Sequence, residues 1–256
     1  MPYQINIIGS GNVAWHIARA MDMAGHKIAQ VYSRDLKDAQ DLAHPYLADA
    51  LDDIRMLKDN AGATFICVSD SAINEVAGQM LQPKNLVVHT SGAISIDILK
   101  DISPYYGVFY PVQTLSAGKP VNFFDVPVCI EGSNKVAEQQ LKALADTVSN
   151  QVQYLDSEKR RHLHLAAVFA NNFTNALYRE AAEILEAQGM NFDLLRPLIK
   201  ETAEKVQRLS PGEAQTGPAK RNDDETIRKH LALMPDGLKK QLYQLFTEII
   251  KDQKRG

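Results

Sequence analysis

The short stretch after the first apolar segment has the residue types and spacing of a phosphate-binding turn. Gly9, Gly11 and Ala14 form the pattern G-x-G-x-x-A between the segment QINII and a segment of helical periodicity. The first glycine permits a tight bend, the second lets the main chain approach a pyrophosphate, and the alanine keeps the helix close to its strand. The amides at the helix start add partial positive charge. The pattern predicts a dinucleotide site, and the alternative is a turn that only connects strand to helix. The expected binding residues are Gly9, Ser10, Gly11, Asn12, Val13 and Ala14.

The end of the second predicted strand indicates which dinucleotide would bind. An NAD site normally has a carboxylate here for the ribose hydroxyls, whereas an NADP site has to neutralise a 2′-phosphate. Ser33 and Arg34 stand at this place, and a hydroxyl beside a guanidinium suits a phosphate. Asp35 is expected to cap the next helix with its side chain turned away. The sequence therefore favours NADP over NAD, and the missing carboxylate also argues against S-adenosylmethionine. The alternative for Arg34 is a solvated surface charge.

Two kinds of periodicity divide the chain. Up to residue 153, β-rich runs alternate with helical segments, which is typical of a parallel sheet covered by helices on both faces. We expect an α/β fold with a doubly wound Rossmann domain over 1–153, connected as βαβ throughout. The predicted strands lie near 4–8, 28–32, 63–68, 85–90, 105–109, 126–130 and 151–154, and the predicted helices near 12–24, 35–42, 71–81 and 134–148.

An all-α domain is expected over 154–256. One helix can run from a cap at Asp156 or Ser157 to Gly189, and apolar residues on several of its faces suggest burial by neighbouring helices or a second subunit. Apolar stripes predict further helices near 193–209 and 237–251. The segment 210–223 is too long and too rich in proline and glycine for a simple connector, so we expect it to be functional or mobile.

Composition limits the partners. The chain has 256 residues, of which 45% are hydrophobic and 23% charged, and its net charge of -3 gives no field that would gather nucleic acid or an anionic membrane. We expect a small-molecule substrate and a second copy of the chain as partners. Cys67 and Cys129 lie in apolar runs, so neither a disulfide nor a metal site is expected. With no leader or membrane-spanning run recognised, the expected location is the cytoplasm.

Segments along most of the chain resemble one group of enzymes. They are IIGSGNVAWHIARAM, VYSRD, FICVSDSAI, HTSGAIS, YPVQTLS and TGPAKRNDDETIRKHL. The chain resembles Rossmann-like NADP oxidoreductases with a helical C-terminal domain of unknown function. These are distant relatives of pyrroline-5-carboxylate reductase, deazaflavin-dependent NADP oxidoreductase and the β-hydroxyacid dehydrogenases. The resemblance implies an NADP-binding domain, a helical domain that often forms a dimer interface, and a substrate cleft between them. It implies no particular substrate.

Polar residues follow the third and fourth predicted strands, where a doubly wound sheet binds its ligands. Val68 and Ser69 are expected to line the coenzyme, and Asp70 to cap the following helix or to contact the ligand. Thr90 and Ser91 are expected near the nicotinamide or the substrate, with Ser91 as a catalytic candidate. His89 is either a satisfied strand histidine or a proton-transfer group.

Two positions depart from the resembling enzymes. Tyr110 stands where relatives often have histidine, and a phenol is the poorer acid or base at neutral pH. In the β-hydroxyacid dehydrogenases a lysine three residues before an Asn-Asn pair supplies a proton, but Val168 precedes Asn171 here. His164, one turn earlier, is the alternative general acid, in a predicted polar stripe with Asn171 and Asn175. The competing interpretation is that this stripe hydrogen-bonds another helix or a dimer mate.

Arg221 completes the candidate set. It follows the turn formed by residues 216–218, and Asp223 or Asp224 can cap the next helix. Its guanidinium could bind a carboxylate or phosphate of the substrate, or an acid across a dimer seam. We predict an NADP-dependent oxidoreductase that transfers hydride to or from a carbonyl, imine or deazaflavin, with Ser91, His164, Asn171 and Arg221 as catalytic candidates. The alternative function is a non-catalytic NADP-binding regulatory or scaffold protein.

Overall fold

The computed structural model describes residues 2–59 and 61–252. Packing divides the chain into two units, Met1–Asn172 and Phe173–Gly256. The division falls after the last strand, because the first part of the following helix packs with the sheet. The domain boundary predicted at 153/154 stays a prediction, and it falls one residue before the last strand ends at Tyr154.

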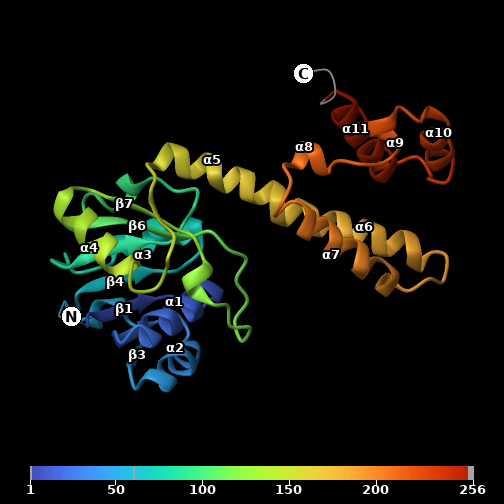
Figure 1. Ribbon diagram of the computed structural model, residues 1–256. Helices are drawn as coiled ribbons and strands as arrows, with labels where there is room; N and C mark the ends of the chain where they lie inside the picture. The colour runs from blue at the N-terminus through green and yellow to red at the C-terminus, as the bar shows by residue number, and fades with distance from the viewer. Residues whose placement is uncertain (1, 60, 253–256) are drawn as a thin grey trace. The chain divides into compact units, whose positions relative to one another are not determined.

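The first unit is built on one twisted sheet (Figure 1). Its order is β3-β2-β1-β4-β5-β6-β7-β8, the arrangement of a doubly wound Rossmann sheet with added strands. The chain continues from β1 to β2 on one side and reaches β4 on the other, so the switch point lies directly after β1. The strands are β1 Gln4–Ile8, β2 Lys27–Tyr32, β3 Asp49–Leu51, β4 Ala63–Ile66, β5 Leu86–His89, β6 Tyr106–Pro111, β7 Val128–Gly132 and β8 Val152–Tyr154.

Two features of the sheet differ from the prediction. The edge strand β3 was missed, because three residues carry no readable alternation. The βαβ connection expected throughout is also wrong, since β7 pairs antiparallel with β6, with Tyr110 opposite Cys129. The physical reason is the connection 112–127, which contains only one 3-10 turn and no crossover helix of the kind that parallel neighbours need.

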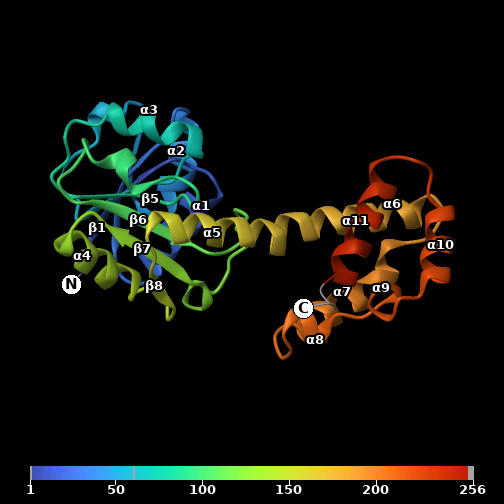
Figure 2. The same ribbon diagram turned by 90° about the horizontal axis from the view of Figure 1, so that it is seen from above.

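Helices cover both faces of the sheet (Figure 2). One face packs against α1, α2 and α4 around Ile7, Phe65 and Phe109. The other packs against α3 and the 3-10 turn Ile96–Leu99 around Ile66 and Val87. The alternation of side chains along each strand produces these two cores. The helices of this unit are α1 Asn12–Met23, α2 Leu36–Ala43, α3 Ile73–Gly78, α4 Lys135–Ala145 and α5 Ser157–Ala167.

The long helix predicted after residue 156 contains a π-helical segment. It begins as α5 with Asp156 as its N-cap, which confirms one of the two predicted caps. Residues Val168–Phe173 are π-helical, and α6 Thr174–Glu186 follows. A π segment adds about one residue to a turn and shifts the faces that follow it. The single stripe predicted through His164, Asn171 and Asn175 therefore does not hold as an α-helical face.

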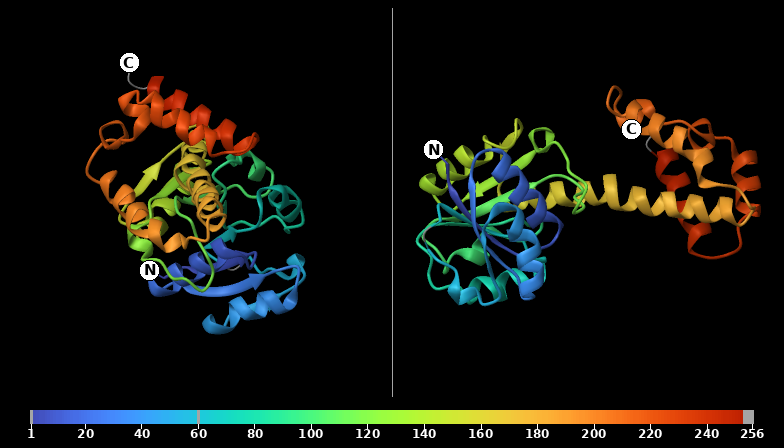
Figure 3. Two further views of the ribbon diagram at one scale, coloured as in Figure 1. Left: turned by 90° about the vertical axis from the view of Figure 1, so that its right-hand side faces the viewer. Right: turned by 90° about the horizontal axis from the view of Figure 1, so that it is seen from below.

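The second unit contains only helices. They are α6, α7 Arg196–Lys205, α8 Pro211–Ala214, α9 Pro218–Arg221, α10 Asp224–Ala232 and α11 Leu238–Asp252. The short helices α8 and α9 occupy the segment expected as a loop, and α9 packs against α11 (Figure 3). Asp223 is the N-cap of α10, which confirms the first of the two predicted caps, Asp223 or Asp224. Among the described residues, no helix is long and apolar enough to cross a bilayer.

Candidate functional site

Gly9 is required by the fold at the turn after β1. Its φ is +109°, and a Cβ atom here would lie 2.6 Å from the carbonyl oxygen of Cys67. Its amide donates to the carbonyl oxygen of Tyr32 at 2.7 Å. Only glycine adopts this conformation without strain while touching the neighbouring main chain. Gly9 thus closes the turn across β1, β2 and β4.

Gly11 has a different environment. Its φ of -77° suits any residue, and a Cβ atom would meet no heavy atom within 4 Å. Gly11 is the N-cap of α1 and provides no side-chain cap, and no acidic residue lies in the first turn. The first helical amide with a main-chain partner is that of Trp15, which donates to Gly11 O at 3.0 Å. The preceding amides and the open space fit a pyrophosphate held at a helix N-terminus.

The end of β2 lies beside this turn. The hydroxyls of Ser10 and Ser33 are 3.1 Å apart, and Ser33 is buried. Arg34 is exposed and has no ion pair within the described chain. Asp35 accepts a hydrogen bond from the amide of Lys37 at 2.8 Å, so the prediction that it caps α2 is confirmed. Among the described residues, Arg34 therefore forms no ion pair with the neighbouring Asp35 carboxylate.

The connection 112–127 contacts the first turns of α1. The Ala117 amide donates to Asn12 Oδ1 at 2.9 Å, and His16 Nε2 lies 3.0 Å from the carbonyl oxygen of Ser116. Oδ1 of Asn12 is thus engaged with this connection, and the side-chain and main-chain N–H groups of Asn12 are the donors that could bind a phosphate. No sequence pattern indicated that the connection 112–127 borders the start of α1.

The predicted residues after β4 follow the glycine turn. A Cβ atom on Gly9 would also lie 3.2 Å from Val68 Cγ1, so Val68 borders the turn. Ser69 is the N-cap of the 3-10 turn Asp70–Ala72, and Asp70 is its first residue. The prediction that Asp70 caps the helix is therefore wrong. Its carboxylate is exposed, and a contact with the ligand stays a prediction.

His89 is buried at the end of β5. Its Nδ1 accepts a hydrogen bond from the Ser91 amide at 3.2 Å, and its Nε2 has no protein partner. The pKa of His89 is lowered to about 4, mainly by burial and secondly by the charge of Arg160, while the Ser95 main chain acts in the opposite direction. His89 is therefore neutral at pH 7.

Thr90 and Ser91 have structural contacts of their own. The Ser91 hydroxyl oxygen accepts hydrogen bonds from the amides of Ala93 and Ile94 at 3.0 and 3.1 Å. The Thr90 hydroxyl donates to the carbonyl oxygen of Ile66 at 3.4 Å. Both residues are buried. The Ser91 side chain thus shapes the turn after β5, and its catalytic role stays a prediction.

Tyr110 and His164 meet beside this turn. The Tyr110 hydroxyl lies 3.1 Å from His164 Nδ1, which joins the end of β6 to α5. A Cβ atom on Gly92 would lie 2.7 Å from Tyr110 Cζ and 2.8 Å from His164 Nδ1. The glycine lets the main chain after β5 reach the pair. Burial is the main cause that raises the pKa of Tyr110, so the phenol stays protonated at neutral pH.

Arg160 anchors α5 to the sheet. Its side chain is buried and forms an ion pair with Glu131 on β7. It also donates to the carbonyl oxygen of Ile94 and, at 3.1 Å, to Ser157 Oγ, while Glu131 accepts from the amide and hydroxyl of Ser157. Since Arg160 lies one helical turn before His164, this cluster sets the position of His164. The sequence analysis missed it, because Arg160 stands in the charged run EKRRH, which has the composition of a solvated face.

The two remaining catalytic candidates belong to different units. Asn171 is exposed within the π-helical segment of the first unit and makes no hydrogen bond to His164 or Ser91 among the described residues. Arg221 is exposed at the end of α9 in the second unit. Their roles stay predictions.

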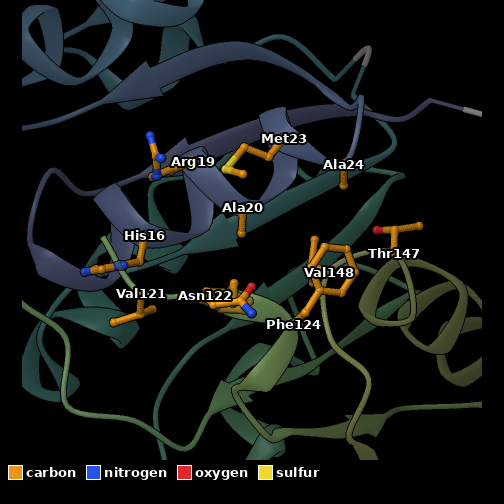
Figure 4. A pocket seen from close by; sticks show the side chains of 11 residues that line it. His16, Arg19, Ala20, Met23, Ala24, Val121, Asn122, Phe124, Thr147 and Val148 are labelled. Carbon is orange, nitrogen blue, oxygen red and sulfur yellow. The ribbon is translucent and has the colours of Figure 1, made fainter. Parts of the chain in front are cut away.

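A small pocket of the first unit lies away from these groups. It is formed by α1, the segment 121–124 and residues 147 and 148, which follow α4 (Figure 4). Its lining residues include Arg19, Met23 and Phe124, and none from the glycine turn or the Tyr110–His164 pair. In the described part of the chain, no three His, Cys, Asp or Glu side chains are arranged to hold a metal ion.

Comparison with known proteins places the chain in a family. A crystal structure of a Bacteroides fragilis protein, provisionally assigned as an NADP oxidoreductase, is 39% identical, with 98% of each chain covered and a TM-score of 0.89. The family "NADP oxidoreductase coenzyme F420-dependent" matches residues 4–92, and "Domain of unknown function (DUF2520)" matches residues 126–250. The chain therefore belongs to the same family of NAD(P)-dependent oxidoreductases as the Bacteroides fragilis protein. The resemblance stated from the sequence is thereby confirmed.

More distant matches share the fold. A Thermotoga maritima protein is 24% identical, with 98% of this chain and 100% of that chain covered and a TM-score of 0.82. A 1-pyrroline-5-carboxylate reductase from Streptococcus pyogenes is 11% identical, with 98% and 99% covered and a TM-score of 0.66. A comparison with curated proteins found no match. The predicted fold class, a Rossmann domain followed by a helical region, is confirmed.

Proposed function

We propose that this chain is an NADP-dependent oxidoreductase that transfers hydride between NADP(H) and a small carbonyl, imine or deazaflavin partner. The observation that carries the proposal is the turn at residues 9–14. The fold requires glycine at position 9, because a Cβ atom there would clash with Cys67. The fold does not require glycine at position 11, where a Cβ atom would meet open space, and a glycine is expected there if a ligand occupies that space. Bound nicotinamide supplies the hydride chemistry, and the chain supplies orientation and a proton.

The preference for NADP over NAD rests on the end of β2. Arg34 is exposed and unpaired within the described chain, beside the hydroxyls of Ser10 and Ser33. A 2′-phosphate there would gain charge-assisted hydrogen bonds without breaking an existing ion pair. NADH offers only a ribose hydroxyl, and no carboxylate stands at Ser33 or Arg34 to accept from it.

Calorimetric titration with NADPH and NADH tests the coenzyme. Arg34→Ala is expected to weaken NADPH binding about tenfold or more, since hydrogen bonds to a charged group contribute roughly 1.5–3 kcal/mol. NADH binding should change little. Arg55→Ala is the matched control, because Arg55 is an exposed arginine already paired with Asp53. Equal binding of the two coenzymes by wild type and Arg34→Ala would remove the preference, and no heat with either would remove the proposal.

The alternative is an NADP-binding protein without turnover. Val168 in place of a lysine and Tyr110 in place of a histidine favour it. A spectrophotometric panel of carbonyls, cyclic imines and a deazaflavin separates the two functions. An oxidoreductase consumes NADPH absorbance at 340 nm with at least one acceptor, whereas a binding protein shows coenzyme-induced thermal stabilisation alone.

We further propose a second copy of the chain as partner. Apolar side chains of the helical unit are exposed on α6 and α11, including Ile184 at 49% and Leu245 at 54%. A groove lined by Leu177, Leu242 and Phe246 lies between these helices. Apolar surface of this kind is stabilised by burial against a partner. This support makes the helical unit the expected dimer interface.

A further inference from the structure

The hydrogen bond between Tyr110 and His164 joins two groups that can each donate a proton. One comes from a strand and the other from a helix, and both side chains are partly exposed. Gly92 lies beside both rings, and a Cβ atom there would collide with each of them. Tyr110 therefore stands at the end of β6 beside the turn that follows β5. Ligands of doubly wound sheets bind beyond such strand ends.

The sheet places Tyr110 on a defined face. Side chains two apart on a strand share a face, so Tyr110 shares one with Tyr106, which packs on the core around Val87. His89 follows Val87 by two residues and lies on this face as well. His89 pairs in register with Val108, the residue two before Tyr110. A phenol and two imidazoles, those of Tyr110, His89 and His164, thus lie near this end of β5 and β6.

The pair is held from the helix side. Arg160 fixes the preceding turn of α5 through Glu131 and the carbonyl oxygen of Ile94. The ionisable groups around Tyr110 are Cys129, Arg160 and Asp70, of which the first and last raise its pKa and Arg160 lowers it, all less than burial does. The phenol is therefore protonated at neutral pH and can donate a hydrogen bond, and the lowered pKa of His89 makes that ring a weak base.

We infer that Tyr110 and His164 form a proton-donating pair and that the acceptor reduced at this site is a carbonyl group. The inference rests on the proposed function. The carbonyl carbon accepts a hydride, with its electron pair, from the reduced nicotinamide. The carbonyl π pair moves to the oxygen, which takes the proton of the Tyr110 hydroxyl. The tyrosinate takes the proton on His164 Nδ1 while solvent protonates Nε2 of the same ring, so the ring ends as its other neutral tautomer. The products are an alcohol and the oxidised coenzyme.

The chemistry of the other acceptors suits the pair less well. An iminium nitrogen already carries its proton, so a proton donor at this point has no step to assist, and the nearby Glu131 carboxylate is already paired with Arg160. A deazaflavin takes its proton on a ring nitrogen remote from the carbon that accepts hydride. A carbonyl needs its proton on the atom next to the reacting carbon. A hydroxyl backed by an imidazole provides a proton at one such point.

Steady-state kinetics with wild type and two matched pairs of variants test the inference. The probes are cyclohexanone and benzaldehyde as carbonyls and 2-methyl-1-pyrroline as an imine. Tyr110→Phe and His164→Gln are each expected to lower kcat with the carbonyls by about 10² or more, with KM nearly unchanged. Tyr106→Phe makes the same substitution at the other end of β6. His162→Gln is the histidine control on α5, where Nδ1 of the exposed His162 ring lies 2.9 Å from the carbonyl oxygen of Glu158. Both controls should keep the wild-type kcat.

A second measurement does not depend on turnover. In protein labelled with ¹⁵N-histidine, the His164 Nδ1 resonance is assigned by its loss in His164→Gln. It is expected to move in Tyr110→Phe and to stay in place in Tyr106→Phe. Thermal stabilisation by NADPH, measured for every variant, reports folding and coenzyme binding and should match wild type.

The outcomes separate this inference from the proposed function. NADPH stabilisation without oxidation by any carbonyl, turnover of the imine alone, or an unmoved Nδ1 resonance in Tyr110→Phe overturns the inference and leaves coenzyme binding standing. Absence of NADPH stabilisation in wild type overturns both. Carbonyl reduction that depends on Tyr110 and His164, together with the moved resonance, supports the inference.

Discussion

Arg160 on α5 and Glu131 on β7 form an ion pair in which the arginine side chain is 1% exposed. Because a buried charge without its partner is costly, Arg160→Met and Glu131→Gln are each expected to lower the free energy of unfolding by roughly 3 kcal/mol. The double variant should lose less than the sum, because it leaves no unpaired charge. Urea denaturation measures the cycle. Lys135→Ala removes an exposed ion pair with Glu138 and should leave the midpoint in place. Strict additivity of the two substitutions would contradict the prediction.

Gly9 and Gly11 are expected to respond oppositely to alanine. Gly9→Ala forces a Cβ against Cys67 O at a φ of +109°, so the free energy of unfolding should fall by about 2 kcal/mol or more. Gly11→Ala meets open space at an ordinary φ, so it should keep wild-type stability but weaken NADPH binding about tenfold or more. Differential scanning fluorimetry with and without NADPH measures both effects. Wild-type NADPH binding by a folded Gly11→Ala protein would refute the assignment of this space to pyrophosphate.

His89 makes stability depend on pH. Below pH 6.5 the unfolded chain protonates this residue, whereas the folded chain does not until about pH 4. The unfolded state then binds more protons, so stability falls as the pH drops through this window and is independent of His89 above it. The expected loss is roughly 3 kcal/mol. His26, whose pKa burial also lowers, acts in the same direction in every variant.

Urea denaturation between pH 4 and 7 measures this effect. His89→Asn retains an acceptor for the Ser91 amide and should flatten the dependence. His162→Asn, at an exposed position, should not. Parallel curves for wild type and His89→Asn would show that His89 is not the titrating group.

The exposed face of α6 predicts the oligomeric state. Light scattering should give twice the mass of one chain for wild type, and Ile184→Glu should give monomers, because a charge on that face opposes burial. Leu81→Glu is the control, at an apolar side chain 71% exposed in the other unit. A wild-type monomer, or dissociation by both variants, would count against the proposed interface.

Local signals predicted much of the fold. The caps at Asp35, Asp156 and Asp223 were readable, because a short acidic side chain before a periodic segment has one favourable role. The buried state of Cys67 and Cys129 followed from the apolar runs around them. The glycine turn was readable because the strand and helix on either side specify its context.

Long-range contacts account for what was missed. The direction of β7 depends on its pairing with β6, which lies far from local sequence signals. Asp70 is not the N-cap because the 3-10 turn begins one residue earlier than predicted, with Ser69 as its N-cap. Arg160 is buried only because Glu131 and Ile94 O converge on it from 29 and 66 residues away. The meeting of Tyr110 with His164, 54 residues apart, likewise depends on the position of α5. No periodicity encodes such contacts.

The antiparallel pairing of β7 has a consequence for the connection 112–127. Its two ends leave the sheet side by side, with the Val112 amide bonded to Pro127 O at 2.8 Å. Its contacts with Asn12 and His16 divide the loop into shorter arcs. Because these contacts already hold the loop at two points, further ordering of the loop would cost less conformational entropy. A dinucleotide that binds at the glycine turn would therefore meet a loop that is already ordered. Little of its binding free energy would be spent on ordering that loop.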